Sequence, residues 1–267
     1  MDRDWNIRSV VRSLDVLRAI NAAGSMSMMQ IALHCALPYP TARRIVHTLE
    51  EQGLLEREAS RKHYRPTVLV HALSHGYQDH SGIVEIARPR LEALTRQHFW
   101  PVSLVTRVGQ TMVVRDCTHA ISPLALNNYQ AGAAFPLFES ASGHVMLAYA
   151  TPDERDLWLR AARENAAPLS ASMHAWFEDE AWSDAIRAAG CATRGANRFT
   201  TTPGRTSSIA APIIRGGEVC GALTIVFFAA AMRLSVAQER YADELIATAR
   251  MISRELDELD APARMVA

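Results

Sequence analysis

The sequence contains almost no lysine: Lys62 is the only one among 267 residues, and arginine carries the rest of the strong positive charge. Basic and acidic residues are nevertheless balanced, with 28 lysine plus arginine against 28 aspartate plus glutamate, so the formal net charge is zero. Net charge therefore indicates neither a nucleic-acid nor a membrane partner, and any partner has to be argued from particular segments.

Long apolar runs are also missing. No stretch of about 18 apolar residues occurs, which excludes a predicted transmembrane helix. The first residues, MDRDWNIRSV, lack the apolar core of a signal peptide. We therefore expect a cytoplasmic protein with no membrane partner.

Paired cysteines and common metal or phosphate motifs are absent as well. The sequence has no CxxC pair, no HExxH and no Walker loop. We expect no metal site and no cofactor. The cysteines are widely spaced and are predicted to be free thiols: Cys35, Cys117, Cys191 and Cys220.

The length suits two domains, and the first 67 residues have a distinctive order. Residues 9–23 carry apolar side chains at helical spacing, with Val10, Leu14, Leu17 and Ile20 expected to face inward. A second short helix is expected over 27–37 and a third over about 41–52, followed by two extended runs, LLERE and HYRPT. Helix, helix, turn, helix and hairpin is the order of a winged helix-turn-helix, which we assign to residues 1–67.

Residues 68–99 are again helical in pattern, with a break near Ser81 and Gly82, and are predicted to form a helical linker. From residue 100 to 267 strands such as VSLVTRV and VCGALTIVFF alternate with helices, and RGGE joins the last two strands. This mixture predicts an α+β sensor domain.

The third helix carries the clearest chemistry. Ala42, Ile45, Val46 and Leu49 would form its buried stripe, which leaves a polar face at its N-terminal end: Thr41, Arg43, Arg44, His47 and Thr48. In helix-turn-helix proteins this end enters the DNA major groove, where arginine can pair with guanine. Tyr39 and Thr41 are suited to phosphates.

The hairpin that follows adds Arg57, Arg61, Lys62, His63 and Arg65, a group suited to phosphate contacts. We select Arg61 and Lys62 as its DNA-binding residues. A solvated amphipathic helix and a charged surface hairpin are the alternative reading, and the whole element order favours DNA.

Three segments resemble the isocitrate-lyase-regulator (IclR) family of bacterial transcription factors: LPYPTARRIVHTLEEQGLLER, PLFESASGHVMLAYATPDER and SSIAAPIIRGGEVCGALTIVF. The resemblance covers about residues 9–256. It implies a winged helix domain, a helical linker and a GAF-like effector-binding domain, assembled as a homodimer or homotetramer on double-stranded DNA. VVRDCTHAISPLAL resembles the branch that regulates aromatic-acid catabolism, such as the hydroxyphenylpropionate regulator, which implies an aromatic effector and catabolic target genes.

The sequence departs from the family pattern at His144, where many members have lysine, and at the bulky Val226-Phe227-Phe228 run. These larger apolar groups favour an aromatic ring over a small oxo-acid. The resemblance then implies this set of effector-binding residues: Leu126, Phe135, Leu137, Ala141, Ser142, Gly143, Arg194, Arg198, Ser207, Ser208, Thr224 and Phe227.

Each of these residues has a plainer alternative role. The amides at 141–143 are expected to face the ligand from a helix N-terminus, although Ser142 could serve only as a helix cap. Arg194 or Arg198 would pair with a carboxylate, or either could be a surface residue. Phe227 could fill the core instead of touching the ligand.

Two other functions remain open at this point. Ser142 beside His144 could suggest a hydrolase, but the GxSxG nucleophile elbow is absent, so we expect no enzyme. A winged helix used for protein contacts is the third possibility. Salt dependence of duplex binding separates that module from a DNA-binding regulator.

Overall fold

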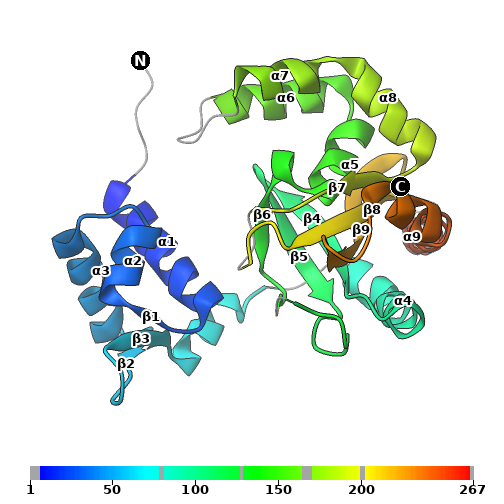
Figure 1. Ribbon diagram of the computed structural model, residues 1–267. Helices are drawn as coiled ribbons and strands as arrows, with labels where there is room; N and C mark the ends of the chain where they lie inside the picture. Colours follow the sequence, from blue (N-terminus) through cyan, green and yellow to red (C-terminus); the bar gives the residue numbers. More distant parts are fainter. Residues whose placement is uncertain (1–6, 78–80, 127–128, 164–169, 199–201, 265–267) are drawn as a thin grey trace. The chain divides into compact units, whose positions relative to one another are not determined.

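The computed structural model describes residues 7–77, 81–126, 129–163, 170–198 and 202–264. The chain forms two compact units, Met1–Gln78 and Asp79–Ala267 (Figure 1). The division falls inside the stretch that we predicted to be a linker, whose residues 78–80 lie outside the described parts.

The first unit has the order of a winged helix-turn-helix, which confirms the predicted fold. Its elements are α1 (Arg8–Ala23), β1 (Met26–Ser27), α2 (Met28–His34), α3 (Tyr39–Glu51), β2 (Leu55–Arg57), β3 (His63–Pro66) and the 3-10 helix η1 (Val68–Ser74). The strands form an antiparallel sheet in the order β1-β3-β2.

Local sequence signals explain where these helices begin. Ser27 and Gln30 form a reciprocal capping box at the start of α2, in which each side chain satisfies a free backbone N–H of the other. Pro40 sits at the beginning of α3, where its missing N–H costs nothing. Helix α2 ends at His34, three residues earlier than the predicted limit.

The core of the first unit lies between the three helices and β3. It includes Ile20, Ile31, Val46, Leu49 and Leu55. The expected inward face of α1 was wrong in its first half: Leu17 and Ile20 are buried, but Val10 is 51% exposed and Leu14 46% exposed. The N-terminal half of α1 therefore has an apolar face that its own unit does not cover.

The second unit consists of one six-stranded sheet and the helices on its two faces. Its helices are α4 (Ile83–His98), the 3-10 helix η2 (Leu137–Glu139), α5 (Ala141–Tyr149), α6 (Pro152–Arg163), α7 (Ala171–Glu178), α8 (Glu180–Ala189) and α9 (Leu234–Arg264). Its strands are β4 (Val102–Val108), β5 (Thr111–Cys117), β6 (Ala134–Pro136), β7 (Ala192–Arg194), β8 (Thr206–Arg215) and β9 (Glu218–Phe228).

The sheet is antiparallel, with the order β6-β5-β4-β9-β8-β7. Alternate residues point to opposite faces, so Leu104, Leu223 and Ile225 pack against α4 and α9. The neighbouring residues Ala210 and Ala222 lie on the other face against α5 (Figure 1). This arrangement is the α+β fold that the sequence predicts.

Two short strands and one helix were not predicted. β1 and β6 contain two and three residues, too few for an alternating pattern to be recognised. The helix that was not predicted is α7, which is separated from α8 by Asp179, whose side chain caps α8 by accepting from the Ala181 amide. Among the described helices, none combines the length and the apolar character needed to cross a membrane.

Candidate functional site

The polar face of α3 is the first candidate site. Its predicted buried stripe is confirmed, since Ala42, Ile45, Val46 and Leu49 are buried. On the opposite side Arg43 and Arg44 are exposed, and Tyr39 is 47% exposed. Thr41 and His47 are half-buried at the border between the two faces.

A chain of polar contacts orients part of this face. The Nε of Arg43 donates to Nε2 of His47 at 3.5 Å, and Nδ1 of His47 lies 3.1 Å from Glu50 Oε2. The His47 ring also meets Tyr64 of β3 edge-on, with ring centroids 6.5 Å apart. Arg44 makes no ion pair among the described residues, so its guanidinium is available to a partner.

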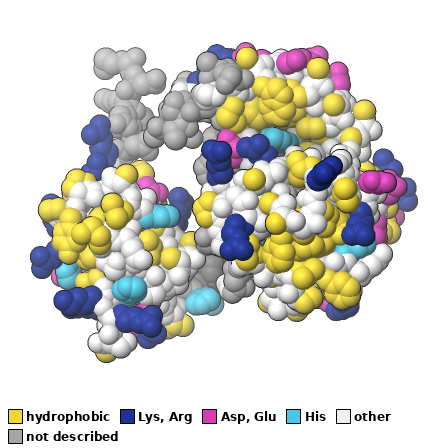
Figure 2. Space-filling view, in the orientation of Figure 1, with side chains coloured by type: hydrophobic (Ala, Val, Ile, Leu, Met, Phe, Trp, Pro, Cys, Tyr) yellow, Lys and Arg dark blue, Asp and Glu magenta, His cyan; other side chains and the backbone are white. Residues whose placement is uncertain are grey.

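The hairpin between β2 and β3 is the wing. Arg65 is engaged by Glu56, with Nε 2.6 Å from Oε1, and His63 Nδ1 lies 3.3 Å from the hydroxyl of Ser25. Arg61 and Lys62 are exposed and have no ion pair within the parts of the chain that the structure describes. Figure 2 shows basic side chains distributed over this unit.

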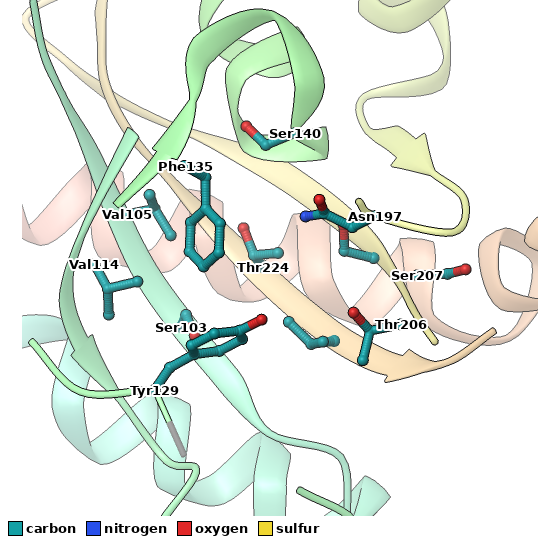
Figure 3. Close-up of a pocket in the computed structure, with 12 residues that line it drawn as sticks. Ser103, Val105, Val114, Tyr129, Phe135, Ser140, Asn197, Thr206, Ser207 and Thr224 are labelled. Atoms are coloured by element: carbon teal, nitrogen blue, oxygen red, sulfur yellow. The ribbon is translucent and has the colours of Figure 1, made fainter. Parts of the chain in front are cut away.

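The second candidate site is a pocket of about 440 Å³ in the second unit. It lies on the face of the sheet that carries α5, and Figure 3 shows the residues that line it, with the Ser207 hydroxyl directed away from the others. Its walls come from β4, β5, β6, β8 and β9, from the N-terminus of α5 and from two loop residues: Ser103, Val105, Val114, Tyr129, Phe135, Ser140, Asn197, Thr206, Ser207, Ser208, Thr224 and Val226.

Two hydroxyl groups in this pocket lack an acceptor. Thr224 is 6% exposed, and its Oγ1 has no hydrogen-bond partner among the described residues. Ser140 Oγ accepts from the Gly143 amide at 3.0 Å and from the Ser142 hydroxyl at 3.3 Å. Because Ser140 Oγ accepts in both of these hydrogen bonds, its own hydroxyl hydrogen remains available to donate.

No charged side chain lines the pocket among the residues that the structure describes. Of the predicted effector-binding residues, Phe135, Ser207, Ser208 and Thr224 belong to its wall. The other predicted residues lie elsewhere, for reasons that differ from one group to the next.

One of the α5 amides expected to face the ligand is already engaged within the protein. The Gly143 amide is taken by Ser140, and a Cβ at position 143 would come within 1.7 Å of the Leu137 carbonyl oxygen. Glycine is therefore required for close backbone packing rather than for ligand approach. Ala141 and Leu137 are fully buried in the core, and Ser142 donates to Ser140.

The expected charged partners also lie outside the pocket wall. Arg194 is bound to Glu139 by an ion pair between Nη2 and Oε2 and by a 3.4 Å bond from Nε to the Glu139 carbonyl oxygen. Arg198 is exposed. A carboxylate in the pocket would therefore be held by neutral hydroxyl groups.

Phe227 and Leu126 line a separate small cavity next to the pocket. Phe227 is 1% exposed and packs edge-on against Trp100, with ring centroids 6.3 Å apart, on the sheet face that carries α4 and α9. It fills the core, as our alternative reading had it, and Val226 takes the place in the pocket wall instead.

Ser142 and His144 do not form a nucleophile and base. Nε2 of His144 is 3.0 Å from the Phe138 carbonyl oxygen, while the Ser142 hydroxyl bonds to Ser140. Burial lowers the pKa of His144 to about 4. Among the described residues, no group of three histidine, cysteine, aspartate or glutamate side chains could hold a metal ion.

Several pocket residues were missed in the sequence. Ser103 and Val105 alternate with the core residues Val102 and Leu104, so strand periodicity could have identified them once β4 was assigned to the sheet centre. Tyr129 and Asn197 come from loops far apart in the chain, and no local signal brings them together.

Comparison with known proteins supports the same division of the chain. Residues 9–59 match the IclR helix-turn-helix domain, and residues 75–254 match the C-terminal domain of the bacterial transcriptional regulator IclR. The HTH-type transcriptional regulator Rv1719 of Mycobacterium tuberculosis is 30% identical over 64% of this chain. The match spans 64% of that relative's length, just under two thirds. BhcR of Paracoccus denitrificans is 27% identical over 92% of this chain and 86% of its own.

Solved structures share the fold. An IclR family transcriptional regulator from Brucella abortus aligns with a TM-score of 0.65 at 23% identity, over 94% of this chain and 93% of the other. An IclR homolog from Microbacterium hydrocarbonoxydans, complexed with 4-hydroxybenzoate, aligns with a TM-score of 0.60 at 20% identity, over 92% and 99% of the two chains. The family matches together cover most of the sequence, and the chain belongs to the IclR family of bacterial transcriptional regulators.

Proposed function

We propose that this protein is a transcription regulator that binds double-stranded DNA through α3 and the wing and responds to a small molecule bound in its second unit. Helix α3 supports this proposal most directly, because its two faces differ in burial and in charge. One side is fully occupied by the core, and the other presents Arg43 and Arg44 to solvent. Since the net charge is zero, affinity for a polyanion has to come from such local groups.

The proposed roles follow from position on the helix. Arg43 and Arg44 read base edges, with guanine O6 and N7 as the natural acceptors. Tyr39 and Thr41, at the N-terminus of α3, hold phosphates, and His47 positions Arg43 through the 3.5 Å hydrogen bond. Arg61 and Lys62 on the wing contact phosphates without reading sequence.

The effector we propose is an aromatic carboxylic acid. Phe135, Val105 and Val226 supply apolar walls. The Thr224 hydroxyl, which has no partner among the described residues, and the Ser140 hydroxyl, which accepts two hydrogen bonds, can each donate to an acceptor-only group such as a carboxylate. The aromatic ligand of the Microbacterium homologue and the aromatic-branch resemblance agree with this class, and with catabolic target genes.

We also propose that the working unit is a homodimer or homotetramer. One winged helix contacts too few base pairs to select a site from a genome, and two related by a two-fold axis would recognise a palindrome. The exposed apolar face of α1, with Val10 and Leu14, provides surface for a second copy. Sedimentation equilibrium should give at least twice the 29.5 kDa chain mass, and a monomer at micromolar concentration contradicts this proposal.

Isothermal calorimetry and thermal unfolding of the full chain test the effector. Benzoates, phenylpropanoates and cinnamates are compared with sugars and short oxo-acids. A binder present at a hundredfold excess over its Kd raises the free energy of unfolding by about 2.7 kcal/mol. Binding of a sugar or a short oxo-acid, together with no response to any aromatic acid, overturns the proposal.

The second candidate function is a winged helix used for protein contacts. The exposed arginines of α3 and the wing favour DNA over this possibility. Affinity for duplex DNA should fall steeply between 50 and 200 mM salt if phosphates are contacted. Absence of duplex binding at low salt would favour the protein-interaction module.

A further inference from the structure

A small cavity lies next to the proposed effector pocket, and His119 is the one polar ring among the described residues of its wall. The cavity has a volume of about 180 Å³. Thr206 and Val226 line both this cavity and the larger pocket, so the two spaces are neighbours that share part of their walls. Apart from His119 and Thr206 its wall is apolar.

His119 is buried without a hydrogen-bond partner. The residue is 4% exposed, and neither Nδ1 nor Nε2 has a partner among the residues that the structure describes. Both nitrogens therefore give up their hydrogen bonds to water and gain nothing in return, which costs free energy unless a bound group pairs with them. Such a position is unusual in a folded protein, and it makes the imidazole a candidate for pairing with a ligand group.

The ring of His119 is also coupled to the larger pocket. It meets the Tyr129 ring edge-on at 4.8 Å between centroids, and Tyr129 in turn meets Phe135 at 5.1 Å. Tyr129 and Phe135 both line the larger pocket. A ligand ring lying against these two aromatic side chains would thus be close to the wall behind which His119 lies.

We propose that the His119 cavity is a second subsite of the effector pocket, in which the imidazole forms a hydrogen bond with a phenolic hydroxyl on the effector's ring. This proposal rests on the proposed function, which places an aromatic acid in the larger pocket. It adds a residue that distinguishes hydroxylated aromatic acids from their unsubstituted parents.

The chemistry of the subsite favours a hydroxyl over other substituents. Burial lowers the pKa of His119 to about 4, so the imidazole is neutral near pH 7 and offers one donor and one acceptor. A hydroxyl also donates and accepts, and it needs no compensating charge. A second carboxylate would be buried among apolar side chains, with no cation among the described residues of the wall.

The test compares matched ligands with matched variants of the full chain by calorimetry. The ligands are benzoate, 3-phenylpropionate and cinnamate, each with its 2-, 3- and 4-hydroxylated forms. The variant His119→Phe keeps an aromatic ring against Tyr129 and removes both nitrogens. In the wild type we expect at least one hydroxylated acid to bind about tenfold or more tightly than its parent.

In His119→Phe the tighter binding of the hydroxylated acid over its parent should disappear. The parent acid should bind the variant at least as tightly as it binds the wild type. Equal weakening of both acids, or a hydroxyl preference that survives the substitution, overturns the subsite and leaves the aromatic effector standing. Failure of every aromatic acid to bind the wild type overturns both.

A second measurement does not depend on folding of the variant. The imidazole ¹⁵N resonances of the wild type are followed during titration with the preferred hydroxylated acid and with its parent. One imidazole should shift with the hydroxylated acid and not with the parent. No imidazole shift specific to the hydroxylated acid contradicts the proposal.

Discussion

Thr224→Val should raise the stability of the free protein and weaken effector binding. Valine has nearly the shape of threonine, so the substitution removes only the hydroxyl. That hydroxyl is buried and has no partner among the described residues, so it reduces the stability of the ligand-free fold. Leaving such a group unsatisfied costs about 1–3 kcal/mol. Its removal should therefore raise the free energy of unfolding of the ligand-free protein by up to that amount.

The same hydroxyl is a proposed donor to the effector carboxylate. A hydrogen bond to a charged group contributes about 1.5–3 kcal/mol, so the Kd for the tightest aromatic acid should rise about 10- to 150-fold. For a unit of this size 1 kcal/mol corresponds to about 2–4 °C in Tm. Tryptophan fluorescence reports mainly on the relevant unit, because four of the five tryptophans lie within it: Trp100, Trp158, Trp176 and Trp182.

Thr118→Val is the matched control. Thr118 is 5% exposed, close to the 6% of Thr224, but its hydroxyl is fully engaged. It lies 2.6 Å from the Thr95 hydroxyl and accepts from the Val102 amide at 2.8 Å. This control should lose about 1–3 kcal/mol of stability, because its partners are left unsatisfied. The reasoning is refuted if Thr224→Val destabilises the free protein as the control does, or changes the Kd less than about threefold.

Further predictions concern DNA, packing and pH. Arg44→Ala should lose about 1–3 kcal/mol of binding free energy on a selected operator. Arg61→Ala should instead weaken binding to all duplexes alike and lower the slope of log affinity against log salt concentration by about one. Anisotropy titrations over a salt series measure both effects. Gly143→Ala should cost at least about 3 kcal/mol in urea unfolding, because its Cβ meets a backbone carbonyl, while Gly76→Ala, whose Cβ meets nothing, should be nearly neutral. The pKa of His144 is about 4 in the fold and 6.5 as its ordinary value, so the unfolded chain binds the extra proton between these values. His144 should therefore contribute a fall in stability of up to about 3 kcal/mol from pH 6.5 to 4, and His144→Leu should remove this contribution and leave the similar one from His119, whose pKa is also about 4.

Much of the fold could be predicted because its signals are local. The buried stripe of α3 follows from helical spacing alone, and the RGGE turn places its glycines at positive φ, where the hairpin between β8 and β9 reverses. The inward face of α1 was misjudged, since spacing identifies an apolar stripe but not how much of it the unit covers. Val10 and Leu14 belong to the stripe and remain exposed.

The pocket was harder to predict because it depends on strand parity and on distant contacts. Thr224 and Phe227 differ by three positions on a regular strand, so they cannot both face the pocket, and this rule alone would have replaced Phe227 by Val226. The pairing of Arg194 with Glu139 could not be foreseen, since 55 residues separate them and nothing local brings them together.

The central claim is that α3 reads DNA sequence and that an aromatic acid controls this binding. The most direct measurement is selection of fragments from the genome that encodes the protein, with wild type and the Arg43→Ala, Arg44→Ala double variant at one salt concentration. We predict that the wild type enriches a few fragments sharing a palindrome with half-sites about one or two helical turns apart. The tightest aromatic acid should change that enrichment, because it must bind one state of the protein better than the other. Equal, unselective recovery by wild type and double variant, unaffected by any aromatic acid, would contradict the account.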